Sequence, residues 1–220
     1  MAVIERYILK DEVMWVSSER CIYWEQQNAL ILSDLHLGKT GHFRKFGIPV
    51  PQDIFKNDLH RLFHQIQYFK ATRLIIVGDL FHSHANKELE LFLKWRKDKS
   101  DVEINLIKGN HDILSVNTYA NLGIDVAKIH MNIGPFCFTH DINSICNQEN
   151  ENNYIFSGHI HPGVKLSGSG KQSLTFPCFY FGKTHAILPA FSLFTGASKI
   201  SITNEDDVFC LINSGLIKLG

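Results

Sequence analysis

The stretch Ala29-Leu30-Ile31-Leu32-Ser33-Asp34-Leu35-His36 places four apolar residues shortly before a carboxylate and an imidazole. A short apolar run of this kind predicts a buried strand. Residues two apart in an extended segment point the same way, so Asp34 and His36 can reach one ion. Taken alone, such a pair is usually an ordinary surface pair, and its meaning depends on the rest of the chain.

The same arrangement occurs twice more along the chain. The strand-like run Arg73–Val77, which is apolar after its first residue, is followed by Gly78-Asp79, and the strand-like run at 102–107 is soon followed by Gly109-Asn110. Each has an ordinary interpretation as well, the carboxylate as a helix N-cap or turn residue and the Gly-Asn pair as a turn. Because these polar residues follow apolar runs, we expect them at the ends of buried strands.

Helical patterns separate these strands. Apolar side chains recur at helical spacing over about residues 52–70 and again over residues 86–97. Alternating strands and helices predict βαβ units around a mostly parallel sheet. Ligands of such sheets bind beyond the carboxyl ends of the strands, so Asp34, Asp79 and Asn110 should meet there.

The second half of the chain changes in character, because strand-like runs predominate and helical patterns are few. These runs lie at Phe136–Thr139, 154–156, Ser173–Phe181 and 199–202. They predict a second sheet packed on the first. Histidines follow two of them: His140 comes after the first run, and Gly158-His159-Ile160-His161 comes after the second. The Gly-His-x-His run is moderately specific for paired ligands.

The overall composition fits one globular domain over residues 1–220. Hydrophobic residues make up 45% of the chain, and 22 Lys and Arg balance 22 Asp and Glu. A strongly basic coat for nucleic acid is therefore excluded, and any such contact must be local. Five cysteines without a CxxC pair, an N-terminus unlike a signal peptide and no long apolar run predict a cytoplasmic protein with free thiols.

Together, the five polar clusters resemble the calcineurin-like metallophosphoesterase superfamily. Its pattern of Asp-x-His, Gly-Asp, Gly-Asn-His-Asp, His and Gly-His-x-His is met in order from Asp34 to His161. The resemblance implies an α/β fold, a calcineurin-like four-layer αββα sandwich of two mixed β-sheets flanked by helices. It also implies a hydrolase with two divalent metal ions, most often Mn²⁺ in this superfamily.

The resemblance further implies a role for each polar residue. One metal would be held by Asp34, His36, Asp79 and His161. The other would be held by Asp79, Asn110, His140 and His159, so that Asp79 bridges the pair. The mixed nitrogen and oxygen set, without a thiolate, suits Mn²⁺, Fe or Zn²⁺. Two such ions would neutralise a phosphodiester, activate a bridging water and clamp the attacking and leaving oxygens.

Three further residues are candidates around this cage. His111 would act as the catalytic proton donor at the leaving group. Asp112 would orient His111, or else serve as an aspartate at a helix N-terminus. His82, three residues after Asp79, would support the ligands or the substrate, or else be an ordinary loop histidine.

Two longer stretches narrow the resemblance. Residues 34–51, which end in Phe-Arg-Lys-Phe-Gly-Ile-Pro-Val-Pro, and residues 188–196 look like the bacterial ligase-associated DNA damage response metallophosphoesterases. These are identified as endonucleases encoded beside a DNA ligase and a helicase, which implies DNA as the substrate. Lys39, Arg44 and Lys45 would hold substrate phosphates, or else form a solvated basic loop. No chemistry follows from residues 188–196.

Two other functions stay open. The same cage would serve a phosphomonoesterase or nucleotide phosphodiesterase with a small substrate, because the metals contact phosphate rather than what is attached to it. A non-catalytic scaffold for a repair partner is the other alternative, although such relatives typically lose ligands that are all present here. The aromatic C-terminal half has enough apolar surface for a homodimer, yet a core between two sheets would use the same residues.

Overall fold

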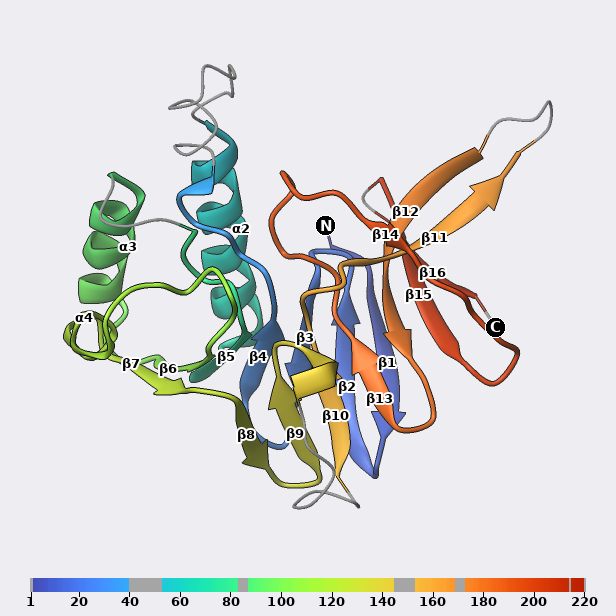
Figure 1. Ribbon diagram of the computed structural model, residues 1–220, viewed down its shortest axis with the longest axis horizontal. Helices are drawn as coiled ribbons and strands as arrows, with labels where there is room; N and C mark the ends of the chain where they lie inside the picture. The colour runs from blue at the N-terminus through green and yellow to red at the C-terminus, as the bar shows by residue number, and fades with distance from the viewer. Residues whose placement is uncertain are drawn as a thin grey trace.

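The computed structural model describes residues 2–39, 53–82, 87–144, 153–168, 173–213 and 215–219, with the backbone alone described at 53–55 and 87–88. Two β-sheets stand side by side in it, with the helices against the outer face of the first (Figure 1). Arg44 and Lys45 lie outside the described residues. Each predicted strand of the first half is present, which confirms the βαβ interpretation.

The first sheet has seven strands in the order of the sequence. They are β1 (Ile4–Leu9), β2 (Glu12–Ser17), β3 (Cys21–Trp24), β4 (Ala29–Leu32), β5 (Arg73–Val77), β6 (Glu103–Ile107) and β7 (Ile124–Ala127). Strands β1 to β4 pair antiparallel, and strands β4 to β7 pair parallel. Lys10 and Asp11 join β1 to β2 with φ of 51° and 65°, which is the geometry of a tight hairpin turn.

Helices connect the parallel strands. Helix α2 (Asp53–Phe69) and helix α3 (Lys87–Asp98) match the two predicted helices within a residue or so at each end. A third helix, α4 (Val116–Asn121), was not predicted, because it has six residues and only Tyr119 of it is buried. So short a helix shows no apolar period, and here the Ser115 hydroxyl caps it by accepting from the Thr118 amide.

The second sheet has nine strands around a parallel centre of β9, β10 and β13. They are β8 (His130–Ile133), β9 (Phe136–Thr139), β10 (Tyr154–Ser157), β11 (Pro162–Ser167), β12 (Ser173–Phe181), β13 (His185–Ile187), β14 (Ser198–Lys199), β15 (Asp207–Ile212) and β16 (Gly215–Leu219). The strand predicted at 199–202 is instead the two-residue β14, which is exposed and pairs only with β11.

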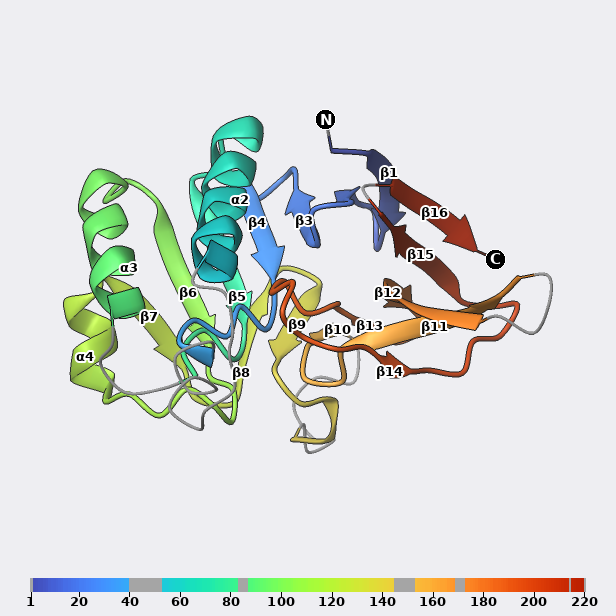
Figure 2. The ribbon, with the colours of Figure 1, turned by 90° about the horizontal axis from the view of Figure 1, so that it is seen from above.

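Two apolar cores hold these layers together (Figure 2). In the first core, Leu62 of α2, Phe92 of α3 and Tyr119 of α4 pack on one face of the first sheet. In the second core, the opposite face of that sheet meets the second sheet through side chains such as Trp24 and Phe138. Alternate residues of β4 serve the two cores, as expected of a strand buried on both faces.

The predicted sandwich of two mixed β-sheets is confirmed, with helices covering the first sheet. The fourth, helical layer is not found on the outer face of the second sheet among the described residues. There, Val164, Cys178 and Val208 form a small apolar cluster of their own. Strands β15 and β16, which the sequence pattern did not predict, extend that side of the sheet beyond β12.

The aromatic residues of the C-terminal half serve mainly the core. Phe179, Phe181 and Phe191 are buried within the chain. This agrees with the alternative that these residues form a core rather than a dimer surface. Cys21, Cys137, Cys178 and Cys210 are buried, and the thiols of Cys21, Cys178 and Cys210 are free. No helix in the described part of the chain is long and apolar enough to cross a membrane.

Candidate metal centre

Polar loops follow the carboxyl ends of the parallel strands in the first sheet. Asp34 comes shortly after β4 and Asp79 shortly after β5, and the loops are joined by Asp34 N–H donating to Gly78 O and His36 N–H donating to Asp79 O. Both carboxylate residues have positive φ, 54° at Asp34 and 51° at Asp79. Non-glycine residues seldom adopt this backbone, and such strain concentrates at functional sites.

The second sheet contributes three histidines to the same place. His140 follows β9, and His159 and His161 follow β10, which pairs with β9 in parallel. The Nδ1 atom of His140 lies 3.1 Å from the Val77 carbonyl, which can only accept, so the proton of the neutral ring is on Nδ1. The Nε2 lone pair is therefore available to a metal.

One side of the centre is enclosed. Asp34 is fully buried and His36 is 5% exposed, and Asp34 Oδ1 lies 3.1 Å from His161 Nε2. Both ring nitrogens of His36 and the Oδ1 atom of Asp34 have no hydrogen-bond partner in the described structure. Burying unpaired polar atoms is costly, so their presence together fits a site that a cation completes. We call Asp34, His36 and His161 the buried half.

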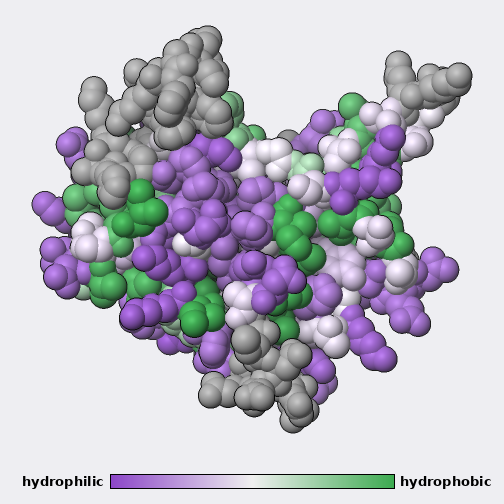
Figure 3. Space-filling model, viewed as in Figure 1, coloured by the Kyte–Doolittle hydropathy of each residue, from purple (hydrophilic) through white to green (hydrophobic). Residues whose placement is uncertain are grey.

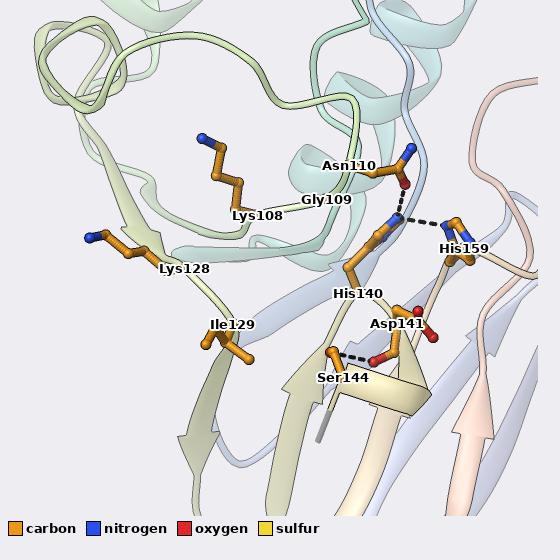
Figure 4. Close-up of a pocket in the computed structure, with 9 residues that line it drawn as sticks. All are labelled: Lys108, Gly109, Asn110, Lys128, Ile129, His140, Asp141, Ser144 and His159. Atoms are coloured by element: carbon orange, nitrogen blue, oxygen red, sulfur yellow. Dashed lines mark hydrogen bonds between the residues drawn. The ribbon is translucent and has the colours of Figure 1, made fainter. Parts of the chain in front are cut away.

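The other side of the centre is open. His140 Nε2 lies 3.1 Å from Asn110 Oδ1 and 3.2 Å from His159 Nδ1. These three residues, which we call the open half, line a pocket of about 280 Å³ (Figure 4). Asn110 and His159 are exposed, in contrast to Asp34 and His36.

Asp79 lies between the two halves. Its Oδ2 atom is 3.9 Å from His36 Nδ1 and 3.6 Å from His140 Nε2, while its Oδ1 atom accepts from the His111 amide at 2.9 Å. Burial raises the pKa of Asp79 above its ordinary value. The structure thus brings together all seven residues that were predicted as ligands.

Potential ligand atoms cluster in two groups. Asp34, His36 and His161 form one, and Asp34, Asp79 and His140 form the other, with the ligand atoms of each group within 4.8 Å of one another. Asp34 belongs to both groups, although the family resemblance implied sharing for Asp79 alone. A nitrogen and oxygen set without sulfur suits a catalytic divalent cation.

Two glycines make room for this arrangement. A Cβ atom on Gly78 would lie 1.9 Å from His140 Nδ1, and one on Gly109 would lie 2.2 Å from Asp79 Oδ1. Gly78 also has a φ of 85°, which disfavours any other residue. Gly78 is therefore required by the close approach of His140 from the second sheet, and Gly109 by the close approach of Asp79 within the first.

Burial and charge shift the titration of the enclosed residues. Burial lowers the pKa of His36 to about 3, against the opposing attraction of Asp34. Burial also acts to raise the pKa of Asp34, but His161, His140 and His36 outweigh it, so this pKa lies below its ordinary value. The buried half therefore favours an ionised carboxylate and a neutral imidazole, the forms that bind metals.

The predicted catalytic residues lie beside the ligands. The His111 ring is 5.5 Å from the His36 ring and 4.2 Å from the His82 ring, measured between centroids. Asp112 is buried, and its carboxylate accepts from the amides of Phe81 and Gly109. It has no contact with the His111 ring in the described structure, and Ser115 rather than Asp112 caps α4. Asp112 thus joins the loops, with its pKa raised to about 6 by burial.

Lys39 is the one basic residue predicted for substrate that the structure describes. It is half-buried, and its amine lies 3.4 Å from the Thr195 hydroxyl. Burial lowers its pKa, while the nearby Asp34 and Asp79 act in the opposite direction. Its amine is therefore held near the carboxylates at the mouth of the centre.

Residues 188–196, for which no role was predicted, form a strap over the Asp34 loop. The Phe191 amide donates to Ser33 O at 2.8 Å, and the Ser192 amide donates to Asp34 O at 3.2 Å. Arg20 donates to the carbonyls of Ala190 and Ser192. The backbone hydrogen bonds from Phe191 and Ser192 fix the position of the ligand residue Asp34, although the strap supplies no ligand itself.

A buried ion pair holds this strap from below. Arg61 of α2 donates to the Phe191 carbonyl, and its guanidinium lies 4.1 Å from the Phe191 ring centroid. The same guanidinium is 3.1 Å from Asp58 Oδ1, whose oxygen also accepts from the Leu193 amide. Sequence reasoning missed this cluster, because a charged residue on an amphipathic helix is usually taken as exposed.

Sequence reasoning also missed two lysines of the pocket, Lys108 and Lys128. Lys108 adjoins the predicted Gly109-Asn110 pair, which is the only signal the sequence offers. Lys128 follows the unpredicted strand β7, so nothing in the sequence pattern placed it near the centre.

Comparison with known proteins identifies a matching family and similar solved structures. A family model described as calcineurin-like phosphoesterase matches residues 28–139. The crystal structure of Pseudomonas putida nuclease MPE is similar with a TM-score of 0.81 and 25% identity, covering 99% of this chain and 100% of that one. No curated protein matches the sequence.

Two further solved structures resemble the chain more distantly. A phosphoesterase from E. coli, Yfce, has 15% identity and a TM-score of 0.43, covering 84% of this chain and 88% of its own. Vps29 from Entamoeba histolytica, complexed with Zn²⁺, has 12% identity and a TM-score of 0.39, covering 87% and 96%. With such low TM-scores, neither adds to the assignment.

Proposed function

The chain belongs to the calcineurin-like phosphoesterase family, and from that premise we propose that it hydrolyses phosphodiester bonds in DNA with two divalent metal ions. As a member of this family it is a metal-dependent phosphoesterase. The observation that carries the two-metal proposal is the position of Asp79, whose Oδ2 atom faces His36 on one side and His140 on the other. A carboxylate so placed can bridge two cations.

The ligands are assigned from the two halves of the centre. Asp34, His36, His161 and Asp79 would hold one ion, and Asp79, Asn110, His140 and His159 would hold the other. When bound, two divalent ions lower the pKa of water and stabilise the negative charge of the reacting phosphate. We take Mn²⁺ as the first metal to test, because the nitrogen and oxygen set suits it and the family resemblance favours it.

His111 is assigned to the leaving group. Its backbone is anchored by the hydrogen bond from its amide to Asp79 Oδ1, so the ring lies next to the centre without occupying a ligand position. A protonated imidazole there donates its proton to the departing alkoxide. His82, with its ring 4.2 Å from the His111 ring, limits where that ring can turn and serves as a positioning residue.

Similarity to a nuclease supports DNA as the substrate. The Pseudomonas putida protein matches over nearly the full length of both chains. The resemblance of residues 34–51 and 188–196 to the ligase-associated subfamily points the same way, to a cytoplasmic role in DNA repair beside a ligase and a helicase. Lys39, and in our proposal Arg44 and Lys45, would contact the DNA phosphates.

A metal-titrated activity panel tests the proposal. Purified protein would be offered p-nitrophenyl phosphate, bis-p-nitrophenyl phosphate and single-stranded, duplex and flap DNA, with Mn²⁺, Zn²⁺, Mg²⁺ or EDTA. We expect Mn²⁺-dependent cleavage of the diester and of at least one DNA, and loss of both in His111→Ala. Cleavage of the monoester alone would replace the proposal with a small-substrate phosphomonoesterase. Inactivity throughout, with His111→Ala complementing a deletion strain, would point to a scaffold.

A further inference from the structure

Lys108 and Lys128 lie at equivalent positions of neighbouring strands. Ile107 pairs with Ala127 at the carboxyl ends of β6 and β7, and the next residue of each strand is a lysine. The Lys108 amide continues the ladder by donating to Ala127 O at 2.9 Å. Because parallel strands lie about 4.8 Å apart, the two lysines leave the sheet side by side.

Both lysines belong to the pocket of the open half. That pocket is lined by Lys108 and Lys128 together with Asn110, His140 and His159. Figure 4 shows the two lysines on the opposite side of the pocket from His159. A phosphate bound at the ligands would therefore leave the lysine side of the pocket unfilled.

The charges at the lysine side do not cancel. Lys108 is half-buried and Lys128 is exposed, and neither amine has an ion-pair partner within the described residues. The carboxylate that lines the pocket belongs to Asp141, whose Oδ1 atom already accepts from the amide and the side chain of Asn143 at 2.9 and 3.0 Å. Two lysines on neighbouring strand ends, with no ion-pair partner within the described residues, give this side of the pocket a positive charge that favours an anionic ligand.

The size of the pocket favours a ligand larger than one phosphate. Its volume of about 280 Å³ is close to the lower end of the roughly 300–1,000 Å³ typical of ligand pockets. The face of the molecule seen in Figure 3 is largely hydrophilic, with apolar side chains in scattered patches. The site is thus suited to a charged chain lying across it.

We propose that Lys108 and Lys128 form a subsite for the phosphate next to the scissile one, which makes a nucleic acid strand a better substrate than a single phosphodiester. A nucleic acid strand carries one negative charge per nucleotide, so its next phosphate lies one nucleotide away along the strand. This inference rests on the proposed function, since it assigns the scissile phosphate to the metal ligands. The preferred substrate class is accordingly a strand that carries at least two phosphates.

The first experiment compares substrates with one and two phosphates. The 5′- and 3′-p-nitrophenyl esters of thymidylate carry one, and the corresponding esters of dithymidylate carry two. We expect kcat/KM of the wild type to be roughly 10-fold higher on a dithymidylate ester, as two exposed charge contacts allow. In the Lys108→Gln/Lys128→Gln variant this gain should be lost, so that the thymidylate and dithymidylate esters have about equal kcat/KM.

Two variants serve as controls. The double variant Lys108→Arg/Lys128→Arg keeps both charges and should keep the gain. Lys97→Gln removes an exposed lysine at the end of α3. This lysine precedes β6 and so lies at the amino ends of the parallel strands, away from the pocket, and its loss should leave the gain unchanged. A wild type without the gain, or a gain that persists in the double glutamine variant, overturns the subsite while leaving the phosphodiesterase activity intact.

A binding measurement separates this inference from the proposed function. Fluorescence anisotropy of a labelled ten-nucleotide oligothymidylate in EDTA measures the affinity of the protein for the strand without turnover. The slope of log K against log salt should become shallower by about 0.7 for each lysine removed. An unchanged affinity and slope in the double glutamine variant would refute the subsite. Failure of every ester to react, with the lysine effect on binding intact, would instead refute the proposed hydrolysis.

Discussion

The buried half and the open half of the centre use similar side chains in opposite surroundings. His36 is 5% exposed and lies beside Asp34 and Asp79, whereas His159 is exposed at the rim of a pocket. His140 of the open half is also only 5% exposed, so the contrast lies mainly between His36 and His159. The first half consists of groups held by backbone hydrogen bonds and by a buried ion pair. The second half faces the space that a substrate would enter. On the two-metal proposal, this difference predicts that the buried half retains its ion while the open half exchanges its ion and contacts the substrate.

The largest expected effect comes from the residue that the halves share. Asp79→Asn keeps the shape of the side chain but removes the negative charge between His36 and His140. We expect kcat on bis-p-nitrophenyl phosphate to fall by more than about 100-fold, because even loss of an outer hydrogen-bonding partner of a metal ligand costs roughly 10–100-fold. Elemental analysis of the bound metal should show less than the wild-type content. Activity within a few-fold of the wild type would exclude a bridging role.

Variants of the ion pair that contacts the strap test what holds the buried half in place. Arg61→Met leaves Asp58 buried beside an apolar side chain, and breaking a buried ion pair in this way should lower the free energy of unfolding by about 3 kcal/mol. Urea unfolding would measure this. The double variant Asp58→Asn/Arg61→Met removes the stranded charge as well and should recover part of the loss. If the double variant is less stable than the single one, the ion pair is not what holds the strap.

Acid should weaken the buried half in the metal-free protein. The pKa of His36 is lowered to about 3 by burial. Unfolded chains protonate histidine below about pH 6.5, so the stability from this residue is present above that pH and is lost as the pH falls toward 3. Between pH 7 and pH 5, His36 should contribute a loss of about 2 kcal/mol to the free energy of unfolding in EDTA. Asp112, whose pKa is raised to about 6, acts in the opposite direction, so the His36 contribution is measured as the difference between the wild type and His36→Asn in urea unfolding.

Matched variants assign that pH dependence to one half. His36→Asn should remove most of the loss between pH 7 and pH 5, because the residue no longer titrates. His159→Asn changes an exposed histidine of the open half and should leave the dependence as it is in the wild type. Equal slopes in all three proteins would contradict the assignment to His36.

The smallest effect concerns the order in which the ions leave. On the two-metal proposal, titration with a chromophoric chelator should show two steps about 10-fold apart in affinity, which is about 1.4 kcal/mol. The weaker step belongs to the open half, so His159→Asn should weaken that step and spare the other. A single step that involves both ions, or a selective effect of His159→Asn on the tighter step, would contradict the assignment of the weaker ion to the open half.

Local patterns were sufficient for strands β4 to β6 of the first sheet, and together with the family resemblance for the candidate ligands. Strands β4 and β5 are continuous apolar runs that end in Ser-Asp and Gly-Asp, and both were predicted with their observed bounds. The short helix α4 and the hairpin of β15 and β16 were not predicted. The former is too short to show a period, and the latter depends on pairing with β12 across the sequence.

The side chains around the centre show a similar division. The hydrogen bond from the Phe81 amide to Asp112 depends on the meeting of two loops, and so does the packing of Gly78 against His140. Sequence spacing cannot reveal contacts between residues so far apart in the chain. The roles of Asp112 in catalysis and of Arg44 and Lys45 in substrate binding stay predictions.

The sequence by itself determined which residues could form the centre, because the ends of buried strands and the residue types are local properties. It also determined the family, through the order of those residues along the chain. Only the tertiary structure decided that Asp34 and His36 are enclosed while His159 is open, since burial depends on how the second sheet and the strap pack. For the same reason, only the register of β6 with β7 placed Lys128 beside Lys108, where a second phosphate could bind.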